Sequence, residues 1–571
     1  MTTPIEAAKR LAKEHGIDDQ HDGKKVSQTT QIVDMVKGSV ALWHSDENEP
    51  FATIENNEHH ENWPLKSRAF RDFIDFNFYT THGKAPNSQV RQAAISTLGG
   101  IARFDGPEHK VWTRGATGEK SIILDLGDAN WNAVTIGPNG WAVTNQPPVK
   151  FRRPKSMQAL PAPKHGGGLT LLREFLNLAS DDDWVLARAW LVQTMFEKGP
   201  YPVLTLHGEA GSAKSTAARV LKSCVDPTIA PLRSQPRNEH DLLIAAKNSW
   251  VIALDNLSNL SSWISDALCR LATGGGLATR ELYSDAEESI FDVQRPVILN
   301  GITTLANRGD LLDRCILLTL PVIAENERRT EEDFWDDFAQ AHPAILGGLL
   351  DAVVGALREL PAVKLERLPR MADFARRAVA AEVGQGWKRG EFMTAYAENR
   401  AGANDTAVEA SMVATAIIEL MASRDEWTGA MTKLLTELNY FVDEAIIRRK
   451  GWPVDGARLG QELRRTAPNL RASGIDIHFD TPSRRVITIR KGLHSTDITD
   501  LPSQTDSDTT TEEVDGHDSN PDGNVGSYSK PKITVTSNRH DHIGVGQWPH
   551  DSDVGSDSKI HDSSNEKLFE Y

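Results

Sequence analysis

The chain has few cysteines and no long apolar run. Its 571 residues include only three cysteines, Cys224, Cys269 and Cys315, which are too few and too scattered for a disulfide framework or a cysteine-type zinc site. No stretch approaches the about 18 apolar residues that a membrane helix needs. The first ten residues lack the apolar core of a signal peptide and predict an amphipathic helix. These absences favour a soluble, cytoplasmic protein with no membrane partner.

A general excess of basic residues is also missing, because 63 Lys and Arg stand against 79 Asp and Glu, a net charge of −16. Spread evenly, this charge would argue against nucleic-acid binding. However, residues 496–571 carry −11 and residues 448–492 carry +7. Only 15 of the 76 residues in 496–571 are apolar, too few to offset the entropy of ordering, so we expect a disordered acidic tail over 493–571. A basic module beside an acidic tail leaves nucleic-acid binding open.

The sequence divides into regions of different pattern. Residues 1–146 mix helical and strand signals and predict an α+β N-terminal domain of unknown role. A Pro- and Gly-rich linker follows over 147–168. Strands and helices then alternate over 169–325, which predicts an α/β core with a mostly parallel sheet. The remaining ordered parts are a helical lid region over 326–425 and a compact basic module over 426–492. The helices predicted in the lid region are Glu331–Ala341, Ala344–Glu359, Arg370–Glu382 and Ala407–Ala422.

The strongest motif joins the apolar strand Val203–His207 to a helix through a loop of small residues. Gly208 and the pair Lys214-Ser215 have the spacing of a phosphate-binding P-loop. Small side chains let backbone N–H groups approach the phosphates, and the following helix presents the positive end of its dipole. We expect Lys214 to reach the β- and γ-phosphates of ATP and Ser215 to ligate Mg²⁺. The predicted nucleotide-binding residues are Gly208, Glu209, Ala210, Gly211, Ser212, Ala213, Lys214, Ser215 and Thr216.

The loop departs from the usual pattern at one position. Ala213 stands where a glycine commonly precedes the lysine, and alanine disfavours a positive φ by about 1 kcal/mol if that position requires one. We expect this departure to affect the rate of ATP hydrolysis more than nucleotide binding.

Polar residues end two later apolar strands. Asp255 closes a strand that begins at Trp250, which predicts a Walker B carboxylate for Mg²⁺, although a capping aspartate is the alternative. Asn256 stands where many such ATPases carry a second acid; an amide can orient a water but cannot act as a base. Asn300 ends the strand Val297–Asn300 and predicts a sensor of the γ-phosphate, with a turn-forming Asn-Gly as the alternative. Arg314, and in second place Arg308, is predicted as an arginine finger; helix capping is the alternative.

With these elements the sequence resembles AAA+ ATPases of the superfamily 3 helicase type, most closely the helicase part of phage, plasmid and virus primase–helicases. The run Leu271-Ala-Thr-Gly-Gly-Gly-Leu-Ala-Thr-Arg280-Glu-Leu-Tyr283 is similar to the family's motif before a hairpin that faces the ring pore. The resemblance covers about residues 190–325. It implies a homo-oligomeric, hexameric ring with ATP between subunits, and a role for Arg280 as a DNA contact; a structural ion pair is the alternative for Arg280.

The basic module predicts helices over Trp427–Leu438 and Gly456–Arg465, followed by a hairpin of Ile475–Asp480 and Arg485–Arg490. Helices followed by a basic hairpin resemble a winged helix. Its predicted DNA contacts are Arg464, Arg465, Arg484 and Arg485, and a winged helix that contacts protein is the alternative.

These patterns lead to two hypotheses. The first is an ATP-dependent DNA helicase or translocase that replicates a phage, plasmid or other mobile element, with single-stranded or forked DNA and replication proteins as partners. The second is an ATP-switched loader or regulator that binds DNA without unwinding it, which Asn256 motivates.

Overall fold

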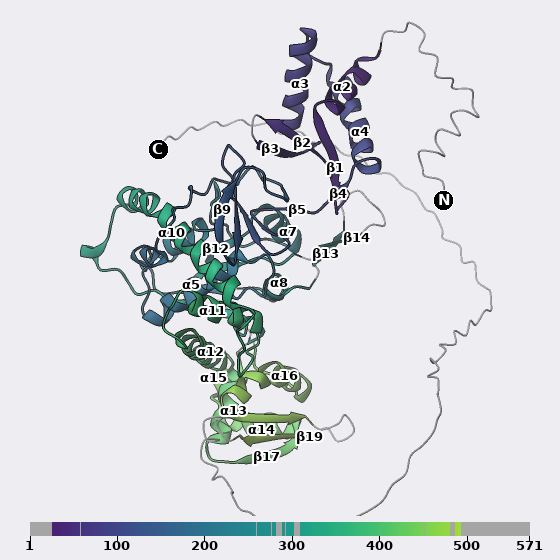
Figure 1. Ribbon diagram of the computed structural model, residues 1–571. Helices are drawn as coiled ribbons and strands as arrows, with labels where there is room; N and C mark the ends of the chain where they lie inside the picture. The colour runs from purple at the N-terminus through teal and green to yellow at the C-terminus, as the bar shows by residue number, and fades with distance from the viewer. Residues whose placement is uncertain are drawn as a thin grey trace, which may run out of the picture. The chain divides into compact units, whose positions relative to one another are not determined.

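The computed structural model describes residues 26–56, 59–257, 260–275, 277–280, 288–291, 293–301, 309–449, 451–479 and 486–492 (Figure 1). The predicted acidic tail and the first 25 residues lie outside these ranges.

The N-terminal part packs helices against a small sheet with strand order β3-β2-β1-β4. Each helix begins at a side-chain cap, Ser27, Ser67 or Asn87, whose oxygen accepts a backbone N–H of the first turn. Apolar residues at helical spacing, such as Phe70, Ile74 and Phe78, are fully buried between the layers. The elements are α2 (Gln28–Lys37), β1 (Val40–Ser45), β2 (Pro50–Asn56), β3 (His59–Pro64), α3 (Arg68–His82), α4 (Ser88–Phe104) and β4 (Glu108–His109).

A second sheet, β6-β7-β8-β9, is antiparallel throughout and follows directly. Its buried residues Leu124, Val134 and Ile136 belong to the same hydrophobic cluster as helices of the region after residue 168. One set of side chains of this sheet therefore packs with the later α/β region, whereas Ala116, Ile123 and Ala133 form a separate cluster with Phe151. The sequence groups these strands with the N-terminal domain. The strands are β5 (Val111–Trp112), β6 (Gly115–Thr117), β7 (Ile122–Asp125), β8 (Ala133–Gly137), β9 (Gly140–Thr144) and β10 (Lys150–Phe151).

A parallel sheet with strand order β12-β15-β11-β16 lies at the centre of the α/β region. Alternate residues of these strands enter two different hydrophobic clusters: Leu204 and Ile298 enter one, Val203 and Val297 the other. Both faces of the sheet are therefore covered, as expected for parallel strands. The elements are η1 (Leu169–Phe175), α5 (Asp181–Met195), β11 (Val203–His207), α6 (Lys214–Ser223), α7 (Glu239–Asn248), β12 (Ile252–Leu257), α8 (Ser262–Thr273), β13 (Leu277–Arg280), β14 (Glu288–Phe291), β15 (Val297–Gly301), α9 (Gly309–Leu312) and β16 (Cys315–Thr319).

The helical region differs from the expected elements at two places. The sequence predicts separate helices before and after Pro343, but α10 (Glu331–Glu359) is continuous through it. The expected helix Ala407–Ala422 is instead the end of α12 (Glu391–Glu409) and the separate α13 (Met412–Ala422), with Ser411 capping the second. The region also contains η2 (Glu325–Glu327) and α11 (Ala372–Gly384). Among the described residues, α10 alone is long and apolar enough to cross a membrane, but 67% of its apolar window is buried, as in the core helix of a soluble protein.

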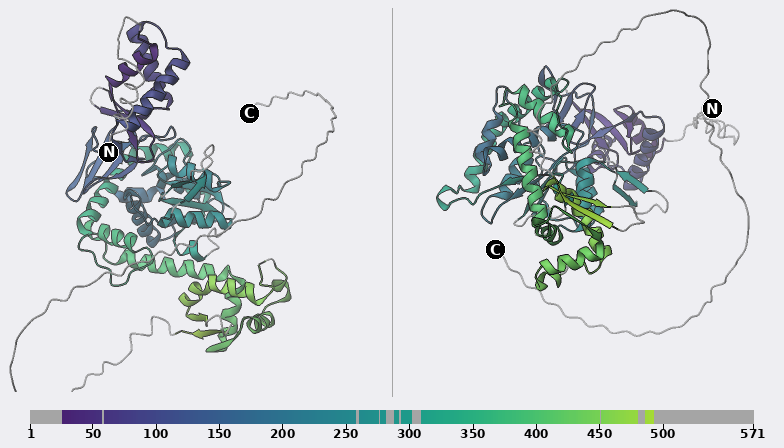
Figure 2. Two further views of the ribbon diagram at one scale, coloured as in Figure 1. Left: turned by 90° about the vertical axis from the view of Figure 1, so that its right-hand side faces the viewer. Right: turned by 90° about the horizontal axis from the view of Figure 1, so that it is seen from below.

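The basic module combines helices with an antiparallel sheet of order β17-β19-β18. The expected helix Trp427–Leu438 begins later than predicted, because Trp427 lies in a strand that pairs with β19. The elements are β17 (Glu426–Ala430), α14 (Met431–Phe441), α15 (Glu444–Ile447), α16 (Gly456–Ala472), β18 (Ile475–Phe479) and β19 (Val486–Lys491). Figure 2 gives two further views of these elements.

Candidate functional site

The loop between β11 and α6 has a conformation that only small residues permit. A Cβ built on Gly208 would lie 2.3 Å from the backbone oxygen of Leu320, so no side chain fits there. Gly211 has a φ of 83° and Ala213, the residue before the helix, has a φ of 59°. The position of Ala213 thus does require the left-handed conformation, which costs alanine about 1–2 kcal/mol.

Lys214 folds its ammonium group back into this loop. Its Nζ donates hydrogen bonds to the backbone oxygens of Gly208 at 2.8 Å and Glu209 at 2.6 Å, and lies 3.2 Å from Oγ of Ser212. Burial lowers the pKa of Lys214, and the negative charge of Asp255 opposes this effect. A cation is therefore placed on the inner side of the loop, close to the carboxylate of Asp255.

Three polar side chains meet at the carboxyl ends of β12 and β15. The hydroxyl of Ser215 donates to Oδ1 of Asp255 at 2.9 Å, and Nδ2 of Asn300 donates to Ser215 at 3.3 Å. Asn300 is only 2% exposed, so its orientation is fixed by these contacts. A hydroxyl beside a carboxylate is a donor set that suits Mg²⁺, which takes few protein ligands and keeps water or phosphate oxygens for its other positions.

Asn256 completes the cluster through its backbone. It has a φ of 53°, and its N–H donates to Oδ1 of Asn300 at 3.1 Å. The side chain of Asn256 is exposed. Because Asn300 accepts from Asn256 and donates to Ser215, it joins the ends of two strands to the first turn of α6.

A pocket of about 520 Å³ adjoins the phosphate-loop residues. Gly211, Ala213 and Thr216 line one side, and the aromatic residues Phe334 and Trp335 of α10 line another. The side chain of Asn177, in the segment before α5, donates to the backbone oxygens of Ser212 and Pro321. The aromatic side chains of the pocket therefore offer an apolar surface on which a planar ring can lie. This surface is next to a loop whose backbone N–H groups suit an anion.

The structure describes only some of the arginines that the sequence predicts as an arginine finger or as DNA contacts. Arg314 lies half-buried in the turn before β16, where Nη1 donates to the backbone oxygen of Asp310 at 2.6 Å; this contact fits the helix-capping alternative. Arg464 and Arg465 are exposed on α16, and Arg465 pairs with Glu462. Arg308, Arg484 and Arg485 lie outside the described residues, as does the side chain of Arg280.

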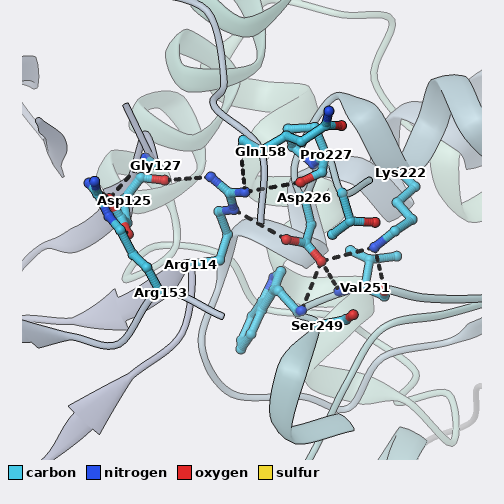
Figure 3. Close-up of polar contacts among 12 residues, drawn as sticks. Arg114, Asp125, Gly127, Arg153, Gln158, Lys222, Asp226, Pro227, Ser249 and Val251 are labelled. Atoms are coloured by element: carbon cyan, nitrogen blue, oxygen red, sulfur yellow. Dashed lines mark hydrogen bonds and ion pairs between the residues drawn. The ribbon is translucent and has the colours of Figure 1, made fainter. Parts of the chain in front are cut away.

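Figure 3 shows a buried charge network beside α6 that no sequence pattern indicates. Asp226 accepts hydrogen bonds from Nζ of Lys222 at 3.0 Å, from Nε of Arg114 at 3.2 Å, and from two backbone N–H groups just before β12. Burial by itself raises the pKa of Asp226, but Lys222 and Arg114 hold it below its ordinary value. These hydrogen bonds connect the end of α6 to the start of β12 and to the turn before β6. The strand β12 carries Asp255.

The chain matches models of two protein families. Residues 169–405 match the "Actinomycete integrative conjugative element replication protein" family, and residues 413–504 match the "AICE RepA C-terminal domain". No curated protein matches the chain significantly.

Among solved structures, two apo structures of the NrS-1 C-terminal region are similar to it. One is 12% identical with a TM-score of 0.36, covering 82% of this chain and 99% of that chain. Another is 10% identical with a TM-score of 0.34, covering 82% of this chain and 100% of that chain. These TM-scores lie below the value that indicates a shared fold. The two family matches support a role in the replication of a mobile element of the actinomycete integrative conjugative type.

Proposed function

We propose that this protein is an ATP-dependent DNA helicase or translocase that acts in the replication of a mobile element. The observation that carries the proposal is the convergence of Lys214, Ser215, Asp255 and Asn300 at one edge of a parallel sheet. The strand order β12-β15-β11-β16, with a parallel bridge from Arg233 to Leu254 on the far side of β12, supports a P-loop ATPase fold of the AAA+ type.

In the proposed complex ATP binds across the loop and the adjoining pocket. The loop N–H groups and Lys214 bind the phosphates, and Phe334 and Trp335 provide an apolar wall for the base. Ser215 and Asp255 hold Mg²⁺, which neutralises phosphate charge when bound. Asn300 orients the hydroxyl of Ser215 and a water near the terminal phosphate. Homo-oligomers of this chain, as hexameric rings, would let an arginine of one subunit reach the next subunit's nucleotide.

The basic module is proposed to bind DNA as a winged helix. The element order α13, β17, α14, α15, α16, β18, β19 and the sheet order β17-β19-β18 support this assignment. The exposed Arg464 and Arg465 lie on α16, the helix directly before the β18–β19 hairpin. Binding through such side chains depends strongly on salt.

The test measures ATP hydrolysis and strand displacement on single-stranded, forked and duplex DNA. We expect Lys214→Ala to abolish both activities, whereas Lys388→Ala, at an exposed lysine far along the chain, keeps them. Strand displacement by Lys214→Ala at the wild-type rate would contradict the proposal. Measuring particle mass with and without ATP tests the ring.

The second candidate is an ATP-switched loader or regulator that does not unwind DNA. The exposed amide of Asn256, in place of an acid that activates water, favours it. DNA-stimulated ATP turnover with no strand displacement on any of the three substrates would select this function.

A further inference from the structure

We propose that Arg328 binds the phosphate chain of ATP in the same subunit, an inference that rests on the proposed ATP site. The subunit would then supply a guanidinium to its own nucleotide, in addition to any arginine that a neighbouring subunit contributes.

The first argument is position. Arg328 lies in the segment between β16 and α10, and this segment runs along the phosphate loop: the N–H of Ile323 donates to the backbone oxygen of Gly211 at 3.4 Å. A Cβ built on Gly211 would have Nη2 of Arg328 as its nearest neighbour, at 3.8 Å. The guanidinium therefore stands over the middle of the loop, where a side chain on Gly211 would project.

The second argument is charge. Two arginines, Arg328 and Arg329, line the pocket beside the loop, and Arg329 pairs with Asp337. For Arg328 no carboxylate partner is present within the described part of the chain, and its side chain is exposed. Arg328 is thus the arginine of the pocket lining whose charge is available to bind a ligand. A guanidinium group can donate hydrogen bonds to two phosphate oxygens at the same time.

The third argument is the shape of the pocket. Arg328 lines the same 520 Å³ pocket as Gly211, Phe334 and Trp335. The aromatic residues lie at the start of α10, and Arg328 precedes that helix by three residues. A nucleotide with its base against Trp335 and its phosphates on the loop would pass beneath the guanidinium of Arg328.

The experiment compares ATP binding and hydrolysis by the full-length variants Arg328→Ala, Arg328→Lys and Arg68→Ala. Loss of one charged hydrogen-bonding group should weaken ATP binding by roughly tenfold or more in Arg328→Ala, with partial recovery in Arg328→Lys. Arg68→Ala is the matched control, because Arg68 is an exposed arginine of α3 that pairs with Asp72 and does not belong to the pocket lining. Unfolding temperatures without nucleotide should be equal in all variants.

Mixing the Arg328→Ala and Lys214→Ala proteins tests whether Arg328 acts on the nucleotide of its own subunit or on that of a neighbouring subunit. If Arg328 acts on its own subunit's nucleotide, every subunit in the mixture is defective and activity stays low. A gain of ATP hydrolysis on mixing would show action across subunits and overturn the inference. Wild-type ATP affinity in Arg328→Ala, with loss in Lys214→Ala, would also overturn it while leaving the proposed ATPase intact. Wild-type affinity in both variants would overturn the ATP site itself.

Discussion

At the residue scale, the conformation of Ala213 determines which side chains the phosphate loop accepts. Its φ of 59° is accessible to alanine at a modest cost but is a strong outlier for a β-branched residue. We therefore expect Ala213→Val to weaken ATP binding by at least about fivefold, the equivalent of about 1 kcal/mol. Ala213→Gly, which has no Cβ, should bind ATP at least as well as the wild type. Titration with a fluorescent ATP analogue measures both, and equal affinity of the valine variant would contradict the required conformation.

A second prediction concerns the buried carboxylate of Asp226. Replacing it with alanine leaves Lys222 and Arg114 buried without their partner, and breaking such a network costs about 3–5 kcal/mol. The free energy of unfolding, measured with urea, should fall by this amount in Asp226→Ala. The control is Glu444→Gln, which removes an exposed partner of Arg448 and should change stability by less than about 1 kcal/mol. Similar losses in the two variants would contradict the assigned role of Asp226.

The phosphate loop and the Asp226 network differ in how far the sequence predicts them. Gly208, Lys214 and Ser215 lie within eight residues of one another, so their spacing alone predicts a loop, and Asp255 and Asn300 are found because each ends an apolar strand. Arg114 and Asp226 are 112 residues apart, and neither belongs to a local pattern. Arg328 cannot be predicted from the sequence for the same reason, because only the packing of its segment on the loop brings it near Gly211.

At the scale of elements, local signals predicted strands of the central parallel sheet but not every helix boundary. The strand Val203–His207 was predicted with its observed ends because an apolar run meets a small-residue loop there. Pro343 was expected to end a helix, yet α10 continues through it. The apolar residues on both sides of Pro343, such as Phe338 and Ile345, are buried in one hydrophobic cluster, and this packing offsets the cost of proline. Trp427 was assigned to a helix because pairing with β19 cannot be recognised from residues 427–438 alone.

The exposed face of α16 gives the prediction at this scale. Arg464 is exposed, and its guanidinium lies 5.1 Å from the ring centre of Phe479 on the following strand. Arg464→Ala should lower DNA affinity at low salt, and the slope of log affinity against log salt should become smaller by about one. Glu462→Gln, which removes the carboxylate beside Arg465, should strengthen binding at low salt. Binding curves at several salt concentrations test both, and an unchanged slope in Arg464→Ala would exclude it as a phosphate contact.

At the scale of the whole molecule, a buried histidine links folding to pH. His342 lies in α10, is 8% exposed, and stacks on Phe338 at 4.9 Å between ring centres. Burial lowers the pKa of His342 to about 4, against an ordinary value of 6.5. The unfolded chain therefore binds this proton more tightly than the folded one. The stability contributed by neutral His342 is complete above pH 6.5 and is lost as the pH falls toward 4.

This linkage predicts a loss of about 3 kcal/mol in the free energy of unfolding between pH 7 and pH 4, attributable to His342 alone. Asp226 contributes little in this window, because a carboxylate with a lowered pKa loses its stabilising effect only below its unfolded value of about 4. Urea unfolding at pH 7.5, 6.5, 5.5 and 4.5 should thus show a steeper decline for the wild type than for His342→Leu. The wild-type free energy of unfolding minus that of His342→Leu should therefore decrease as the pH falls, whatever the variant's stability at pH 7.5, because leucine cannot take up a proton. Parallel curves would mean that His342 is protonated equally in the folded and unfolded chains.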